Sequence, residues 1–192
     1  MPTGDARDGL DLGFDAGVTA TIMTNSMVGV GVDLGYQRWP GSSYLNSSVD
    51  ALFSRLHRVS ISGSKYTLSA FQITGHVKVV AAMVGPAAPW IQVGAGFYRL
   101  NRHLRLPAEQ LKSSEWPEPK QNWDDIKTEP GWFGGVGVDF KTSTSTKLGL
   151  DASYYRLCTK LGLDMSSFHL WPDAGADLAE FRTGAHLLFG RR

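Results

Sequence analysis

Residues 9–22 read GLDLGFDAGVTATI. From Leu10 to Ile22 every second residue is apolar, and the residues between them are Asp, Gly or Thr. A period of two residues over this length predicts a β-strand whose two faces meet different surroundings. The same alternation returns along the rest of the chain, so this stretch decides the expected fold.

Alternating segments of this kind predict seven strands in all, and we expect them near residues 10–22, 27–39, 66–82, 90–104, 132–142, 147–159 and 181–189. Short polar connections follow the first, third and fifth segments. Long connections rich in polar and turn-forming residues follow the second, fourth and sixth, at roughly 40–65, 107–131 and 161–180. Short turns at one end and long loops at the other are typical of an up-and-down barrel. We therefore expect a single all-β domain over residues 1–192, built as an antiparallel up-and-down barrel.

The polar face of the predicted strands is mostly glycine, with few charged side chains. A face in contact with water usually carries many Lys and Glu residues, whereas a narrow barrel interior has room for only a few large groups. We therefore expect the polar face to line a lumen and the apolar face to meet lipid, which makes the barrel transmembrane. In the opening strand the lumen would receive Asp11 and Asp15, and lipid would contact Leu10, Leu12, Phe14, Val18 and Ile22.

Two sets of residues follow from this assignment of faces. The charged groups expected to pair inside the lumen are Asp33, Lys78, Asp139, Lys141, Asp151 and Arg182. The aromatic residues near strand ends, expected to form girdles at the membrane interfaces, are Tyr36, Trp39, Tyr66, Trp90, Trp132, Phe181 and Phe189.

Composition and motifs give no sign of catalysis or of a cofactor. The 19 basic and 18 acidic residues leave a net charge of +1, which argues against a nucleic-acid partner. Cys158, the single cysteine, permits no intramolecular disulfide and is expected to be an ordinary strand residue. The five histidines have no metal-ligand spacing, so we expect no metal and no cofactor, and His76 and His186 are expected to hydrogen-bond inside the lumen.

The runs GVGVDLGYQRW, WIQVGAGFYRL, GGVGVDFK and LGLDASYYR resemble the small outer-membrane β-barrel proteins of Gram-negative bacteria, the OmpA/OmpX/OmpW-like, porin-like group. The resemblance implies a location in the outer membrane, in contact with lipid and lipopolysaccharide. It also implies insertion by the barrel-assembly machinery. The sorting signal of such last strands is matched by Arg182, Gly184, Leu187 and Phe189. The chain departs from the family pattern in the Gly190-Arg191-Arg192 tail that follows the aromatic residue.

The number of predicted strands is odd, whereas bacterial single-chain barrels have an even number. With seven strands, the first and last run in the same direction and could close only as a parallel pair. We therefore expect an eight-stranded type whose first strand, together with a signal peptide, is missing ahead of Met1. Two alternatives are an irregular eighth strand at 56–64 and a strand supplied by a partner chain.

Three functions are compatible with these features. The expected one is a non-catalytic outer-membrane barrel whose long extracellular loops bind a ligand or surface, or which passes small apolar solutes. The second is a soluble lipocalin-like barrel that binds an apolar ligand. The third is a barrel enzyme that modifies lipid A, for which Ser166, Ser167 and His169 offer a nucleophile and a base in one loop. The basic run NRHLRL at 101–106 is expected to lie near charged head groups through Arg102 and Arg105.

Overall fold

The computed structural model describes residues 2–3, 10–57, 60–81, 85–107, 122–142, 146–160, 164–165, 168–169 and 177–189. These residues are mostly β-strand. A six-stranded antiparallel meander is formed by β2 (Phe14–Met23), β3 (Val28–Pro40), β4 (Lys65–Val80), β5 (Ala87–Arg105), β6 (Asn122–Lys141) and β7 (Thr146–Lys160). The expected sheet of sequential antiparallel neighbours is thereby confirmed.

Two more strands extend the sheet beyond β7. The strand β10 (Asp177–Phe189) pairs antiparallel with β7, and the short β1 (Pro2–Thr3) pairs antiparallel with β10, giving the order β1-β10-β7-β6-β5-β4-β3-β2. A separate two-stranded sheet joins β8 (Asp164–Met165) to β9 (Phe168–His169). Within the described residues no ladder joins β2 to β10 or β1, so hydrogen bonds do not close the sheet into a barrel.

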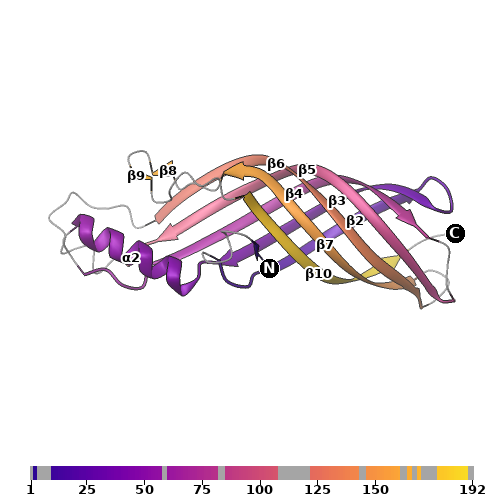
Figure 1. Cartoon of the computed structure of the whole chain (residues 1–192), viewed down its shortest axis with the longest axis horizontal. Helices are drawn as coiled ribbons and strands as arrows, with labels where there is room; N and C mark the ends of the chain where they lie inside the picture. The colour runs from indigo at the N-terminus through magenta and orange to yellow at the C-terminus, as the bar shows by residue number, and fades with distance from the viewer. Residues whose placement is uncertain are drawn as a thin grey trace.

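The sheet is strongly curled. Figure 1 shows the C-terminal strands passing in front of the N-terminal ones, so that one face of the sheet is concave. We call the end with the short connections after β2, β4 and β6 the turn end. The opposite end, where the long connections lie, is the loop end.

Burial separates the two faces as the alternation predicts over the turn-end half. On β4 the side chains of Gln72, Thr74, His76 and Lys78 are buried on the concave face, while the residues between them are exposed. The exposed apolar residues of the outer face form what we call the apolar band: Val18, Ile22, Val30, Val32, Leu34, Ile73, Val77, Val79, Ile91, Val93, Val136, Phe140, Leu148 and Leu150.

In the loop-end half the concave face is apolar. An apolar plug fills it, made of Leu10, Trp39, Leu45, Val49, Phe53, Ile61, Tyr66, Leu68, Ala70, Tyr98, Leu100, Leu104, Leu106 and Leu157. Leu10, expected to meet lipid, is instead buried in this plug, where it bridges to Gly41 outside the regular part of β2. Trp39 and Tyr66, expected in an interfacial girdle, are also buried here, because the alternation places them on the inner face.

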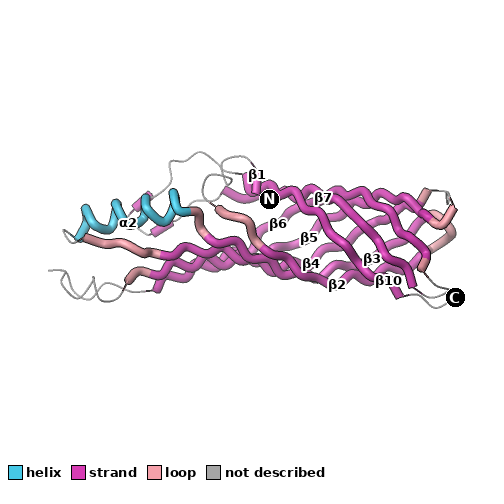
Figure 2. The backbone as a smooth tube through the Cα atoms, turned by 90° about the horizontal axis from the view of Figure 1, so that it is seen from below, coloured by secondary structure: helices cyan, strands magenta, loops and turns pink. Residues whose placement is uncertain are grey.

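A helix occupies the long connection between β3 and β4, which the sequence analysis treated as loop. Helix α2 (Ser43–His57) lies alongside the loop-end extension of the sheet (Figure 2). Ser42, the residue just before the helix, is its N-cap: the Ser42 Oγ accepts a hydrogen bond from the Leu45 amide over 3.2 Å. Leu45, Val49 and Phe53, spaced four residues apart, form the stripe that is buried in the plug.

A second stripe of α2 fastens the returning chain to the helix. The Asn46 Oδ1 accepts the Tyr66 amide over 2.9 Å, and the Asp50 carboxylate accepts the amides of Gly63 and Ser64. Residues 60–64 return along the helix and form no strand, while Leu56 and His57 belong to α2. The described residues of 56–64 therefore do not supply the irregular eighth strand.

The strand β6 also begins earlier than expected, at Asn122 instead of near 132. Its first part pairs with the loop-end part of β5, from Asn122 opposite Arg105 to Pro130 opposite Phe97. The sequence NWDDIKTEP is rich in turn-forming residues, but long-range pairing with β5 overrides this local preference.

Candidate functional site: the polar concave face and the outer face

A hydrogen-bonded cluster fills the concave face between β2, β3 and β4. The His76 Nδ1 lies 2.7 Å from the Asp33 Oδ2, and the His76 Nε2 lies 3.0 Å from the Thr21 Oγ1. Asp33 also accepts hydrogen bonds from the hydroxyls of Thr19, over 2.6 Å, and Thr74, over 3.2 Å. Because a carboxylate only accepts, Nδ1 of the imidazole carries the proton in this contact.

The order hydroxyl, imidazole, carboxylate is also that of a nucleophilic triad. Here the His76 side chain has no exposed surface, 0%, so a substrate could not reach its Nε2. Each member of the cluster instead satisfies another buried polar group, as a low-dielectric interior requires. We therefore interpret the cluster as a structural filling of the concave face of the sheet.

A second cluster lies nearer the turn end. Lys78 Nζ is 3.1 Å from the Asp139 Oδ2, which joins β4 to β6 across the intervening β5. The Trp90 Nε1 donates to the other carboxylate oxygen over 2.8 Å, and the Lys78 ammonium sits 4.2 Å from the Trp90 ring centroid. Trp90, expected at an interface, is buried here because its indole closes this ion pair.

Glycines on the concave face make room for these large groups. A Cβ added to Gly31 would overlap the His76 ring, and one added to Gly137 would overlap the Trp90 ring. The glycine-rich face is thus the counterpart of a few large side chains packed against it, as in a narrow barrel interior.

The concave face changes from polar to apolar toward the loop end. Gln37 Nε2 donates to the Gln72 Oε1 over 2.6 Å, and beyond this pair lies the apolar plug. Within the plug Arg102 is buried and pairs with Asp125 over 3.1 Å. Burial raises the pKa of the Tyr66 phenol to about 12, against an opposing effect of the nearby Arg102.

On the outer wall, six exposed aromatic residues border the apolar band on its loop-end side, and we call them the aromatic row: Phe14, Tyr36, Phe71, Phe97, Trp132 and Tyr154. Two pairs of neighbours in the row contact each other: the ring centroids of Phe14 and Tyr36 are 6.0 Å apart, and those of Trp132 and Tyr154 are 5.9 Å apart. On the three strands that run toward the loop end, an exposed arginine follows two residues after a member of the row: Arg38 on β3, Arg99 on β5 and Arg156 on β7.

The residues predicted as charged lumen groups are distributed as follows. Asp33, Lys78 and Asp139 are buried and paired as described, Asp151 on β7 is half-buried, and Lys141 is exposed at the end of β6. Arg182, Gly184, Leu187 and Phe189 lie in β10, where their backbone pairs with β7 and their side chains are outside the description. Ser166 and Ser167 lie outside the described residues, and His169 ends β9.

The sequence analysis missed Thr19 and Thr21 as partners of the lumen groups, and it missed Trp90 as the neighbour of Lys78. The inward direction of the two threonines could have been predicted, because Thr19 and Thr21 lie on the polar face of the opening strand, on either side of Ala20. Trp90 carried the same signal, since in the predicted strand at 90–104 it alternates onto the face of Gln92 and Gly94. Arg102 lies on that same face of β5, and Asp125 is directly opposite it in the β5–β6 ladder.

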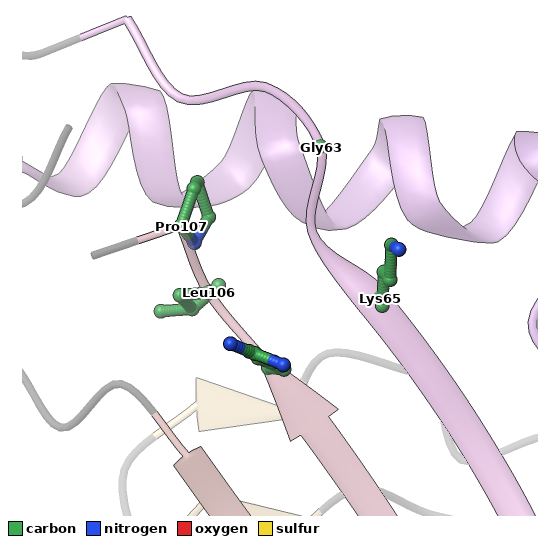
Figure 3. Close-up of a pocket in the computed structure, with 5 residues that line it drawn as sticks. Gly63, Lys65, Leu106 and Pro107 are labelled. Carbon is green, nitrogen blue, oxygen red and sulfur yellow. The ribbon is translucent and has the colours of Figure 1, made fainter. Parts of the chain in front are cut away.

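A shallow pocket lies at the loop end, lined by Gly63, Lys65, Arg105, Leu106 and Pro107 (Figure 3). Lys65 and Arg105 are directly opposite each other in the β4–β5 ladder, so two cations share one rim of this pocket. An anionic group would be attracted there.

Comparison with known proteins gives no relative: no family model, no curated protein and no solved structure matches the chain. Among the described residues, no helix has the length and apolar character needed to cross a membrane. The same residues contain no group of three His, Cys, Asp or Glu side chains placed to hold a metal ion.

Proposed function

We propose that this chain is a non-catalytic β-barrel protein of a Gram-negative outer membrane, with its loop end outside the cell and its turn end in the periplasm. The single observation that carries the proposal is the apolar band, exposed around the outer face of the same strands whose inner face is polar and paired. In water, contiguous exposed apolar surface of this extent is rare on a monomer.

The height of the exposed apolar surface fits a membrane. On β2 the outer face is apolar from Phe14, in the aromatic row, to Ile22. At about 3.3 Å per residue and a strand tilt of about 40°, this stretch spans roughly 20 Å along the barrel axis, close to the height of about 25 Å of the apolar band of outer-membrane barrels.

The border of the band supports the same placement. Aromatic rings prefer the membrane–water interface, and arginines just beyond them reach phosphate-bearing head groups. The sequence Tyr36-x-Arg38 and its equivalents on β5 and β7 place such an arginine beside the loop end of the aromatic row on alternate strands. Lipopolysaccharide, whose lipid part carries phosphates, is the lipid this arrangement would contact in the outer leaflet.

The two other functions fit less well. A lipocalin-like barrel would place its apolar face inside and its charged face in water, the reverse of the turn-end half. For an enzyme, the hydroxyl–imidazole–carboxylate contact is the strongest feature, and its histidine has no exposed surface.

The loop end is where we place the biological activity. Helix α2 lies there, packed into the apolar plug, and its remaining surface would be presented to the medium. Passage of small apolar solutes fits less well, because the apolar plug fills the concave face of the loop-end half.

Fractionation of cells that express the full gene product tests the proposal. We expect the protein in the outer-membrane fraction, and after purification in detergent we expect faster gel migration unboiled than boiled. Recovery as a monodisperse protein in buffer without detergent would contradict it. A periplasmic or cytosolic location would do so as well.

A further inference from the structure

Two cations lie directly opposite each other at the loop end. Lys65 is the first residue of β4 and Arg105 the last of β5; they are partners in the ladder, and both side chains are exposed on the outer face. Like charges in directly opposed positions destabilise a sheet. Within the described residues neither side chain forms an ion pair with a carboxylate that would offset this repulsion. An anion bound between the two cations would remove it.

The backbone beside this pair is fixed to α2. The Asp50 carboxylate accepts the Gly63 amide over 2.9 Å and the Ser64 amide over 3.0 Å, and the Asn46 Oδ1 accepts the Tyr66 amide over 2.9 Å. These three amides flank Lys65 on both sides, so its main chain is already ordered. Binding at this point therefore costs little further ordering of the backbone.

A cavity of about 210 Å³ adjoins the two cations, and Figure 3 shows the residues that line it. Gly63, with a φ of 91°, makes the turn at one wall, and a Cβ there would meet no other atom within 4 Å. Sites that enclose a whole small molecule measure about 300–1,000 Å³, so this cavity suits one end group of a ligand. Leu106 and Pro107 add an apolar wall, which a bare ion would not use.

We propose that the pocket between Lys65 and Arg105 binds the phosphate group of a phosphate monoester. Two unit positive charges match such a group, which carries a charge of about −1.5 to −2 at pH 7, better than they match a carboxylate. A guanidinium presents paired donors to two phosphate oxygens, and an ammonium contributes a compact charge beside them. The carbon skeleton of the ester would contact the wall formed by Leu106 and Pro107.

The position of the pocket indicates where the phosphate comes from. Lys65 lies six residues before Phe71, the member of the aromatic row on β4. At about 3.3 Å per residue and a tilt of about 40°, the pocket is roughly 15 Å beyond the row along the barrel axis. Phosphates of lipid head groups lie close to the row, so we expect a ligand from the medium. This choice of source rests on the proposed function, whereas the binding site itself does not.

Isothermal titration calorimetry tests the site, with the full chain in an uncharged, sugar-based detergent and phenyl phosphate as the probe. We expect the double variant Lys65→Gln/Arg105→Gln to weaken binding about tenfold or more, because it removes both charged donors. The matched control is Lys141→Gln/Lys147→Gln. These two lysines are also directly opposite each other, but at the turn end, so the net charge changes equally and the affinity should not change.

Further arms of the titration separate the alternatives. Lys65→Arg/Arg105→Lys keeps both charges and should keep most of the affinity, benzoate should bind more weakly than phenyl phosphate, and phosphatidic acid in the micelles should not displace the probe. Circular dichroism would show that each variant retains its strands.

Four outcomes would overturn the proposal: no binding of phenyl phosphate, an equal loss of affinity in the two Gln double variants, benzoate binding as tightly, or displacement by phosphatidic acid, which would assign the site to lipid. Failure of the proposed function is a separate result, because binding is measured in detergent solution and membrane location by fractionation.

Discussion

The two halves of the sheet use the same strands with opposite polarity. In the turn-end half of β4, His76 and Lys78 point inward and Val77 and Val79 point outward, whereas in the loop-end half Leu68 points inward and Ser69 outward. The inner face changes from polar to apolar at the level of the aromatic row, and the outer face changes from apolar to polar there. The difference teaches that one strand can carry two patterns of amphipathicity, one in each half of the sheet.

Removal of the Asp139 carboxylate should have the largest effect on the turn-end half. The substitution Asp139→Ala leaves the Lys78 ammonium buried without its partner, and we expect the free energy of unfolding to fall by about 3–5 kcal/mol. Urea unfolding in detergent measures this change in the free energy of unfolding. The double variant Lys78→Met/Asp139→Leu should recover most of the loss, and a loss under 1 kcal/mol for the single variant would show that the ion pair is not buried.

The apolar plug should be the most sensitive part of the loop-end half. Leu68 has no exposed surface, so Leu68→Ala should destabilise the fold by about 2–5 kcal/mol through lost burial and the cavity left behind. The adjacent Thr67→Ala, on the outer face, should change stability by less than about 0.5 kcal/mol. Equal effects of the two substitutions would mean that the inner face at the loop end is not packed.

The outer face offers the most direct test of what surrounds each half. Val93 is 62% exposed in the apolar band, and in lipid Val93→Lys should cost about 2–4 kcal/mol, measured by refolding into lipid vesicles. Thr128→Lys, on the outer face of the loop-end half, should be nearly neutral. If Val93→Lys were as harmless as Thr128→Lys, the band would face water.

A smaller effect is expected from Tyr66, which lies in the loop-end half. Burial raises its pKa to about 12 from the usual 10, so in the unfolded chain the phenol loses its proton first as the pH rises. Stability should therefore decrease between about pH 10 and pH 12, and Tyr66→Phe should reduce that decrease. Unfolding curves across this range, together with phenolate absorbance, measure the effect. An unchanged slope in the variant would contradict the burial of this hydroxyl.

Much of the turn-end half could be predicted from the sequence. The two-residue alternation fixes strands and faces locally, and it identified Asp33, Lys78 and Asp139 as inward groups. Their partners could not be predicted in the same way. Thr21 and His76 are 55 residues apart and on strands that are not neighbours, so their contact depends on register and curvature together.

The loop-end half was harder to predict, for a different physical reason. Helix α2 and the first part of β6 have polar, turn-forming sequences whose structure depends on packing against β4 and β5. The apolar stripe Leu45, Val49 and Phe53 was the available signal for the helix.

The sequence by itself determined the strands, their antiparallel order and the polarity of each face near the turn end, because a period of two residues is a local property of the chain. Only the tertiary structure decided which polar groups meet across the concave face, where the polarity of the two faces inverts and which edges of the sheet stay apart. Those features arise from contacts between residues far apart in the chain, and their geometry is set by the register and curl of the whole sheet.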